Sequence, residues 1–223
     1  GTAGTANANN GIRLTNAVVE STGTGANAAT INLNAIGDGT SNGNFAIYAQ
    51  GNATRITSID GDIQFDAVGA LNSISSDNVG IRISNIDTIS STGTGNITLN
   101  AVSGKGSGGD HGLQLSGSST DITSNSGNIS LTGTATLGKG DGIRIEGGVT
   151  VQTTTGNMTL NGTQGTFAAA GVNIAGGTHH SFTYKGAGFC LLNDIGLFDW
   201  FSFGIYPELP NLEDSCYSYD FHH

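Results

Sequence analysis

Short segments in which apolar and polar residues alternate recur between residues 11 and 175, separated by glycine-rich stretches. The first kind of segment occurs six times, as Gly11–Leu14, Ala46–Ala49, Gly80–Ile83, Gly112–Leu115, Gly142–Ile145 and Gly171–Ile174. Alternation with a period of two is typical of half-buried β-strands, and the β-branched residues that fill these segments favour strands. Successive segments begin 35, 34, 32, 30 and 29 residues apart, so the chain is built from repeats.

Each repeat holds two further segments of the same kind. The second segment is Arg55–Thr57, Thr88–Ser90, Asp121–Thr123 or Thr150–Gln152. The third segment is Thr30–Leu33, Asp62–Phe65, Asn96–Leu99, Asn128–Leu131 or Asn157–Leu160. Three short strands and a glycine-rich turn per repeat predict an all-β fold, a right-handed parallel β-helix (solenoid) of about five to six rungs.

Stacked rungs lie about 4.8 Å apart, so equivalent residues of successive repeats form ladders. One inward ladder is predicted from the first segment, with Ile12, Ile81, Leu113 and Ile143. A second is predicted from the third segment, with Ile31, Ile63, Ile97, Ile129 and Met158.

A glycine followed by Asp or Asn precedes the third segment in four repeats. The second residues of these pairs are Asp62, Asn96, Asn128 and Asn157. Glycine permits a positive φ and Asn tolerates left-handed geometry, so the pair suits a tight turn. We interpret the four residues as a structural turn ladder rather than a binding ladder.

Insertions of variable length follow the third segment, at Gly37–Gly43, Gly104–His111 and Thr136–Asp141. Their aspartates, Asp38, Asp110 and Asp141, offer oxygen ligands for Ca²⁺, but their spacing matches no calcium loop, and solvated turns are the preferred interpretation.

Arg13, Arg82 and Arg144 share one outward position of the first segment. They form either a stripe that reads anions or a solvated charge row balanced by Glu20, Asp60 and Asp87, and the second interpretation is preferred.

Composition narrows the class of protein further. Charged residues make up 11% of the chain and glycine 37 of its 223 residues, which excludes a helical bundle or coiled coil. The formal net charge of −10 argues against nucleic acid or anionic lipid as a partner. No apolar run is long enough to predict a membrane-spanning helix.

The composition changes near residue 178, so we predict a solenoid repeat region over residues 1–177 and an aromatic tail over residues 178–223. Only Phe45, Tyr48, Phe65 and Phe167 of the aromatic residues precede this boundary. The tail is expected to form a cap or a truncated domain. Both cysteines, Cys190 and Cys216, lie in the tail, either as a disulfide or as free thiols.

The repeats resemble a known family. Ser91–Asn100 (STGTGNITLN) and Ser124–Thr132 (SNSGNISLT) resemble the repeats of large bacterial filamentous-haemagglutinin-type surface proteins. The resemblance covers residues 11–175 and implies a secreted or surface-attached β-solenoid with a structural, adhesin-like role and without catalytic residues.

The tail resembles a different family. Residues 176–195 (GGTHHSFTYKGAGFCLLNDI) are similar to the active-site segment of zinc-dependent histone-deacetylase-like amidohydrolases, and residues 220–223 (DFHH) to a zinc-binding motif of that family. The resemblance implies general acid/base roles for His179 and His180, and zinc ligation by Asp220 and His222. The family also uses a second carboxylate ligand and a tyrosine, for which we find no counterpart, so no working enzyme is expected.

The preferred interpretation is therefore a structural, adhesin-like segment that is extracellular or on the cell surface and needs no cofactor. Surface glycans or other copies of the protein are its expected partners. The alternative is a fragment of a zinc-dependent deacetylase-like amidohydrolase fused to solenoid repeats, with zinc as its cofactor. A third hypothesis, that threonine rows meet a regular lattice, is weakened by Asp60 and Ser124, which interrupt the rows.

Overall fold

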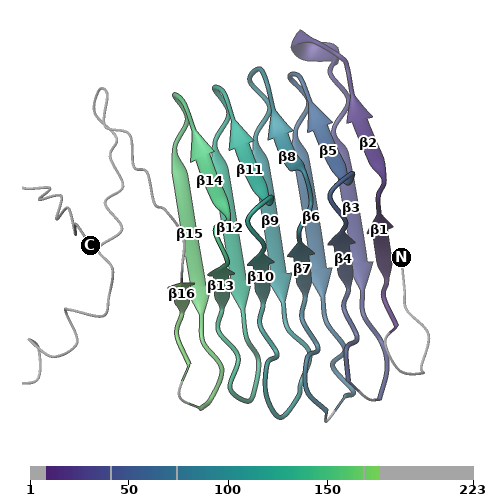
Figure 1. Ribbon diagram of the computed structural model, residues 1–223, viewed down its shortest axis with the longest axis vertical. Helices are drawn as coiled ribbons and strands as arrows, with labels where there is room; N and C mark the ends of the chain where they lie inside the picture. The colour runs from purple at the N-terminus through teal and green to yellow at the C-terminus, as the bar shows by residue number, and fades with distance from the viewer. Residues whose placement is uncertain (1–8, 41, 74, 168, 176–223) are drawn as a thin grey trace, which may run out of the picture. The chain divides into compact units, whose positions relative to one another are not determined.

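The computed structural model describes residues 9–175, apart from residues 41, 74 and 168. Within this range the chain forms sixteen strands in three parallel sheets, and the 3-10 turn η1 (Gly25–Asn27) is the one helical segment of the described part (Figure 1). The predicted all-β parallel β-solenoid is thereby confirmed. It has five complete turns, followed by the first strand of a sixth.

Each turn of the solenoid contributes one strand to each sheet. The first sheet contains β1 (Ile12–Thr15), β4 (Ile47–Gln50), β7 (Ile81–Ser84), β10 (Leu113–Ser116), β13 (Ile143–Glu146) and β16 (Val172–Ala175). The second sheet contains β2 (Val18–Ser21), β5 (Arg55–Ser58), β8 (Thr88–Ser91), β11 (Asp121–Ser124) and β14 (Thr150–Thr153). The third sheet contains β3 (Ile31–Ile36), β6 (Ile63–Val68), β9 (Ile97–Val102), β12 (Ile129–Thr134) and β15 (Met158–Thr163).

The strands pair in the register that the repeats predict. In the first sheet the inward ladder runs through Ile12, Ile47, Ile81, Leu113, Ile143 and Val172. In the third sheet it runs through Ile31, Ile63, Ile97, Ile129 and Met158. Both predicted ladders are confirmed, because alternation places the apolar residues of every strand on the same side.

The interior of the solenoid is a slim apolar core that neighbouring turns bury for one another. Ile47, Phe65, Ile81 and Ile97 are fully buried in the middle turns. Equivalent residues of the outermost turns, such as Ile12 and Met158, are only partly buried. This gradient follows from stacking, because a turn shields its neighbour's apolar face and cannot bury its own alone.

The strands differ from the predicted segments at their ends. Each first strand begins one residue later than predicted, after a glycine or, in the second turn, after Ala46, and the third strands extend over six residues. Close packing favours glycine at Gly112, because a Cβ there would clash with the backbone nitrogen of Thr134. The loop backbone passes so close to the third sheet that no side chain fits at this position.

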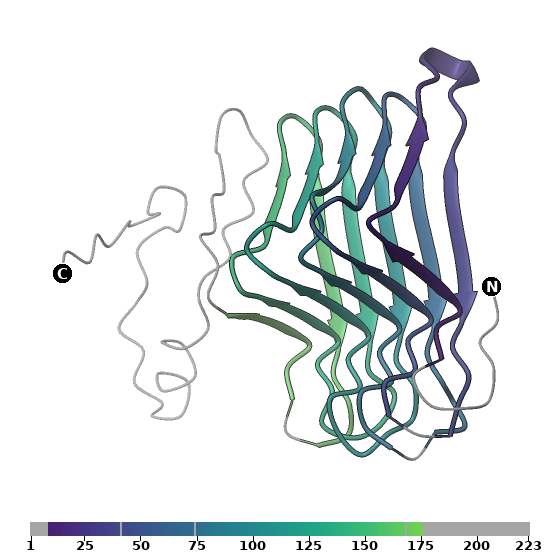
Figure 2. The ribbon, with the colours of Figure 1, turned by 45° about the vertical axis from the view of Figure 1, so that its right-hand side comes forward.

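Two kinds of connection close each turn, at opposite ends of the strands. Tight turns join the second strands to the third strands at the upper end in Figure 1, and longer loops lead from the third strands to the next first strands at the lower end (Figures 1 and 2). These lower loops, which carry the predicted insertions, are called the loop face below.

Candidate functional site

The outward positions of the first sheet form a straight column of long polar and aromatic side chains. The second residues of its six strands pair in the order Arg13, Tyr48, Arg82, Gln114, Arg144 and Asn173. Parallel in-register strands put these side chains about 4.8 Å apart. The structure therefore brings Arg13, Arg82 and Arg144 into one column, on alternate turns.

Tyr48 holds the two arginines of the first turns in a stack. The guanidinium carbon of Arg13 lies 5.8 Å from the centre of the Tyr48 ring, and that of Arg82 lies 5.8 Å from it as well. Arg82 also lies 5.2 Å from the centre of the Phe45 ring, which meets Tyr48 edge to face at 5.0 Å. These cation–π contacts fix the guanidinium groups without neutralising their charge.

Arg144 is held differently, by carboxylates. Its Nε donates to Glu146 over 2.9 Å, and an Nη atom lies 3.7 Å from Asp141. Burial alone would raise the pKa of Glu146, but hydrogen bonds from Arg144 and Gln114 lower it. The positive charge of Arg144 is thus compensated inside the fold.

The outer face of the first sheet consequently carries a positive region on an acidic protein. Neither Arg13 nor Arg82 pairs with a carboxylate anywhere in the described part of the chain. The other outward residues of this sheet are Thr15, Gln50, Ser84, Ser116, Glu146 and Ala175, of which one is acidic. We call the stack of Arg13, Phe45, Tyr48 and Arg82 the arginine–aromatic stack.

Among the described residues, the arginines of this row form no ion pair with Glu20, Asp60 or Asp87, the acidic residues expected to balance them. Glu20 lies on β2 in the second sheet, and Asp60 lies in the tight turn before β6. Asp60 accepts hydrogen bonds there from the backbone of Gly25 and Thr94, which lower its pKa. Backbone N–H groups in the turns, rather than arginines, satisfy this carboxylate.

A second polar arrangement lies on the loop face, where asparagines connect successive turns. The side-chain oxygen of Asn44 accepts from the backbone of Asn9, and its amide donates to Asn78 over 3.0 Å. Asn78 in turn donates to Asp110 from its backbone over 2.8 Å and from its side chain over 3.2 Å. Burial raises the pKa of Asp110, against the effect of these hydrogen bonds.

The ladder continues from His111, the neighbour of Asp110 in the same loop, to Asp141 in the following loop. The backbone N–H of Asp141 donates to Nδ1 of His111 over 2.9 Å, and Asp141 accepts from the backbone of Ala170 and from the side chain of Asn173. Both His111 and Asp141 are buried. Burial lowers the pKa of His111, although the nearby carboxylate of Asp141 acts in the opposite direction.

All three aspartates considered as calcium ligands accept hydrogen bonds within the fold. Asp110 and Asp141 bind backbone and side-chain N–H groups, and Asp38 accepts from the backbone of its neighbour Gly39 over 2.8 Å. The residues that the structure describes contain no group of three or more His, Cys, Asp or Glu side chains placed to hold a metal ion. The aspartates therefore act as acceptors within the fold.

The residues of the predicted turn ladder follow one another along the upper turns. The backbone of Asn96 donates to Asp62, that of Asn128 to Asn96 and that of Asn157 to Asn128, over 2.8 to 2.9 Å. Each side-chain oxygen thus satisfies a backbone N–H of the next turn. The side-chain oxygens of Asp62, Asn96 and Asn128 are therefore used between turns.

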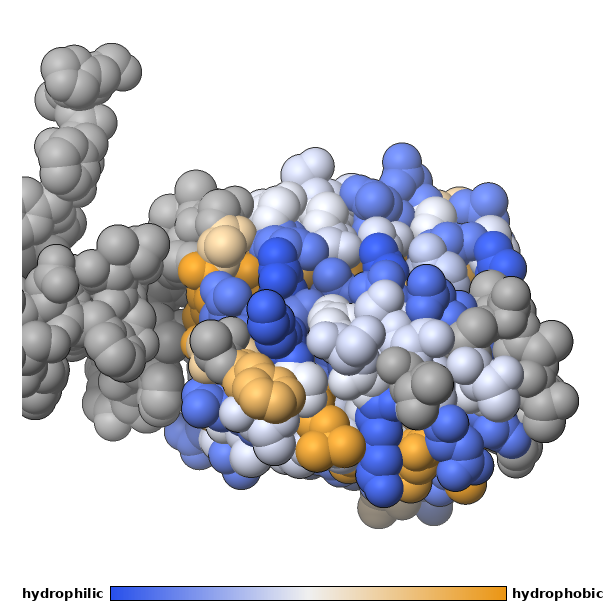
Figure 3. All heavy atoms as spheres, turned by 90° about the horizontal axis from the view of Figure 1, so that it is seen from below, coloured by the Kyte–Doolittle hydropathy of each residue, from blue (hydrophilic) through white to orange (hydrophobic). Residues whose placement is uncertain are grey.

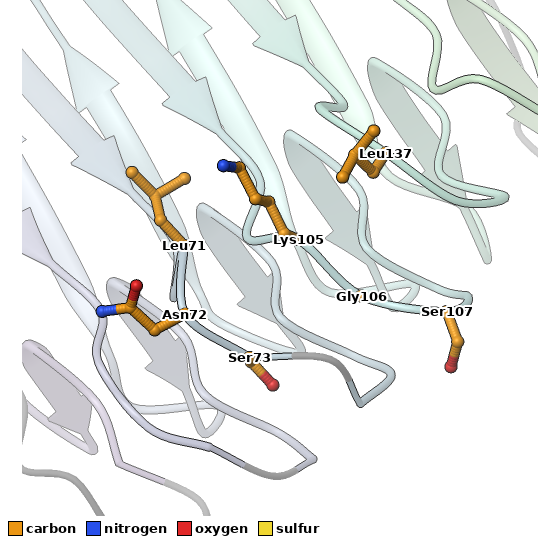
Figure 4. Close-up of a pocket in the computed structure, with 7 residues that line it drawn as sticks. All are labelled: Leu71, Asn72, Ser73, Lys105, Gly106, Ser107 and Leu137. Atoms are coloured by element: carbon orange, nitrogen blue, oxygen red, sulfur yellow. The ribbon is translucent and has the colours of Figure 1, made fainter.

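The loop face also carries a shallow hollow of about 350 Å³. Leu71, Lys105 and Leu137 lie side by side on three successive loops, with the lysine between the two leucines (Figure 4). Seen from below, this face is mainly hydrophilic, with separate hydrophobic patches (Figure 3). Lys105 is the one charged residue among those that line the hollow.

The residues taken from the second resemblance cannot be placed. His179, His180, Asp220 and His222 lie outside the described residues, as do Cys190 and Cys216. Their roles as catalytic groups, zinc ligands or disulfide partners stay predictions.

Sequence reasoning missed the arginine–aromatic stack and the asparagine ladder. Tyr48 shares the second strand position with the three arginines, and this register was the signal for the stack. Asn44 and Asn78 each lie three residues before a first strand, as Asp110 does, and this shared offset was the signal for the ladder.

The geometry defines a class of protein, a parallel β-solenoid with aligned columns of side chains on its outer faces. No helix of the described residues has the length and apolar character needed to cross a membrane. Comparisons with protein-family models, with curated proteins and with solved structures gave no match to the chain.

Proposed function

We propose that the chain is a structural, adhesin-like segment of a secreted or cell-surface bacterial β-solenoid protein. The observation that carries the proposal is the alignment of outward side chains into columns along three straight parallel sheets. Such columns present the same chemistry at regular intervals, which suits attachment to a repetitive surface polymer. The resemblance of the repeats to filamentous-haemagglutinin-type proteins supports the same role.

Two arrangements of the described residues favour a binding role over a catalytic one. The buried aspartates and His111 are engaged with backbone N–H groups between turns. Arg13, which is exposed, stands on the outer face of the first sheet. A flat face without a cavity suits recognition of an extended partner, whereas catalysis normally uses a concave site.

Attachment of the purified full chain to surfaces tests this proposal. Beads coated with the chain should adhere to cells or to immobilised surface polysaccharides, and antibodies should label intact cells of the source organism. Beads coated with the unfolded variant Ile97→Asp are the matched control, because they carry the same composition without the columns. Equal adhesion of both bead types, or labelling only after permeabilisation, would contradict the proposal.

The second hypothesis, a fragment of a zinc-dependent deacetylase-like amidohydrolase, is supported by the resemblance of residues 176–195 alone. It concerns His179 and His180, and it is tested by the turnover measurement described in the Discussion.

A further inference from the structure

The two arginines of the arginine–aromatic stack lie against aromatic rings and form no ion pair with a carboxylate of the described residues. Asp60, Asp110, Asp141, Arg144 and Glu146 all meet polar partners within the fold. Arg13 and Arg82 instead rest against aromatic rings. Arg13 is exposed, and Tyr48 and Arg82 are half-buried, so a ligand lying on the sheet reaches the stack.

We propose that the arginine–aromatic stack binds a polyuronate, a polysaccharide whose sugars carry carboxylates, lying along the column of the first sheet. The inference rests on the proposed adhesin-like function and names the ligand class of that role. Guanidinium groups recognise carboxylates through paired N–H donors, and arginines already held by stacking lose little freedom on binding.

The spacing of the column favours an extended polymer over a single small anion. Arg13 and Arg82 lie two turns apart, which corresponds to about 9.6 Å along the solenoid, and Tyr48 stands between them. Gln114 follows Arg82 in the same column and adds an amide that can hydrogen-bond to the ligand. One anion cannot reach both guanidinium groups across Tyr48, whereas a chain with carboxylates at intervals meets both.

The charge of the protein distinguishes a polysaccharide from a nucleic acid. The formal net charge is −10, so the molecule as a whole repels a nucleic acid, with one charge per about 1.7 Å of duplex, more strongly than a polyuronate, with one carboxylate per sugar. Beyond Gln114 the column reaches Arg144, whose charge Glu146 and Asp141 already compensate. The positive region is therefore confined to the first three turns, which suits a ligand that also has neutral hydroxyl groups to place over Gln114 and the serines nearby.

Binding of polygalacturonate oligosaccharides to the full chain, measured by isothermal titration calorimetry, tests the inference. The probe is compared with the same oligosaccharides after complete methyl esterification, which removes the charge and keeps the backbone. The expected result is binding of the free acid that weakens with added salt, and at least tenfold weaker binding of the ester. Equal affinity for both forms, or tighter binding of single-stranded DNA, overturns the inference.

Substitutions locate the site. The double variant Arg13→Ala/Arg82→Ala should bind polygalacturonate at least tenfold more weakly, and Arg55→Ala, which removes an exposed outward arginine of the second sheet, should bind within twofold of the wild type. If the double variant does not fold, Arg13→Ala alone serves, because Arg13 is exposed, and at least threefold weaker binding is expected. Unchanged affinity in a folded Arg13 variant, or equal losses with Arg55→Ala, overturns the inference.

The two proposals fail in distinguishable ways. Adhesion of coated beads without binding of polygalacturonate overturns the ligand class and leaves the adhesin-like role. Binding of polygalacturonate without adhesion to any surface supports the site and overturns the role.

Discussion

The backbone N–H of Asp141 donates to Nδ1 of His111 over 2.9 Å, across one step of the solenoid. This hydrogen bond needs an unprotonated Nδ1, so the neutral imidazole is the form that fits. Burial separately lowers the pKa of His111, because removal from water disfavours the charged ring. The ring is therefore part of the ladder that connects the loop face from turn to turn.

Stability should consequently fall on mild acidification. An unfolded histidine takes up a proton near its ordinary pKa of 6.5, whereas folded His111 does so only at lower pH. The unfolded state therefore binds more protons in this window, and the stabilising contribution that is present above pH 6.5 is lost as the pH falls towards the folded pKa. Urea unfolding at several pH values between 7.5 and 5 should show this loss.

The variant His111→Asn isolates the contribution of that ring. Its side-chain oxygen can accept from Asp141 but does not titrate, so the urea midpoint of the variant should change less between these pH values. Parallel curves for wild type and variant would show that His111 does not titrate as proposed.

The inward ladder of the third sheet predicts a severe effect of Ile97→Asp. Ile97 is fully buried, and a carboxylate there would have no partner, at a cost of roughly several kcal/mol. The neighbouring substitution Thr98→Asp is the control, because Thr98 points outward on the same strand. Thermal unfolding followed by circular dichroism should show a large fall in Tm for the first variant alone; similar melting of both would refute the inward assignment.

The upper turns predict a smaller effect of Asn128→Ala. This change removes the oxygen that accepts from the backbone of Asn157 over 2.8 Å, and the loss of one such hydrogen bond costs about 1 kcal/mol. Asn128→Asp keeps an acceptor, as Asp62 does at the equivalent place, and should retain most of the stability. The free energy of unfolding in urea separates the two variants, and a larger loss with Asp than with Ala would contradict the ladder.

Glycine in the upper turns is required by close stacking. A Cβ at Gly127 would lie 1.9 Å from the carbonyl oxygen of Gly95, so Gly127→Ala forces the turns apart and should cost roughly 1–3 kcal/mol. Gly108→Ala is the matched control, since no atom lies within 4 Å of a Cβ there. The difference in Tm between the two variants measures the effect, and equal values would show that the turns have room.

For the tail, we predict no turnover of an acetyl-lysine peptide by the full chain loaded with Zn²⁺. The resemblance supplies one carboxylate and one imidazole ligand, Asp220 and His222, whereas catalytic zinc normally has three protein ligands. Weak zinc binding by neighbouring histidines does not decide the matter. Deacetylation that disappears in His180→Ala would instead establish the alternative function.

The fold could be predicted because the same pattern of apolar and polar residues recurs in every repeat. Ile81, Leu113 and Ile143 occupy the same place in three repeats, so a chance alternation in one segment is corrected by the others. The need for glycine at Gly112 was less predictable, because it is set by the backbone of Thr134 on another strand and not by any local preference.

The site was harder to predict for a related reason. Arg13 and Arg82 could be assigned to one column from the repeat alone, but their partners depend on which sheet each nearby residue joins. Asp60 is close to Arg55 in the sequence, yet its carboxylate accepts hydrogen bonds from the backbone N–H groups of Gly25 and Thr94 in two other turns. The aromatic partner, Tyr48, breaks the arginine pattern and is recognised only when the whole column is read in register.

Strand lengths are constant from turn to turn, while the loops absorb all variation in repeat length. The chain therefore behaves as a ruler graduated in repeats. Removal of residues 97–128 would join Asn96 to Ile129 in unchanged register and shorten the ruler by one graduation, about 4.8 Å. It would also delete Gln114 and place Arg82 directly beside Arg144. Gain or loss of a single repeat therefore changes the distance between charges without substitution of any remaining residue.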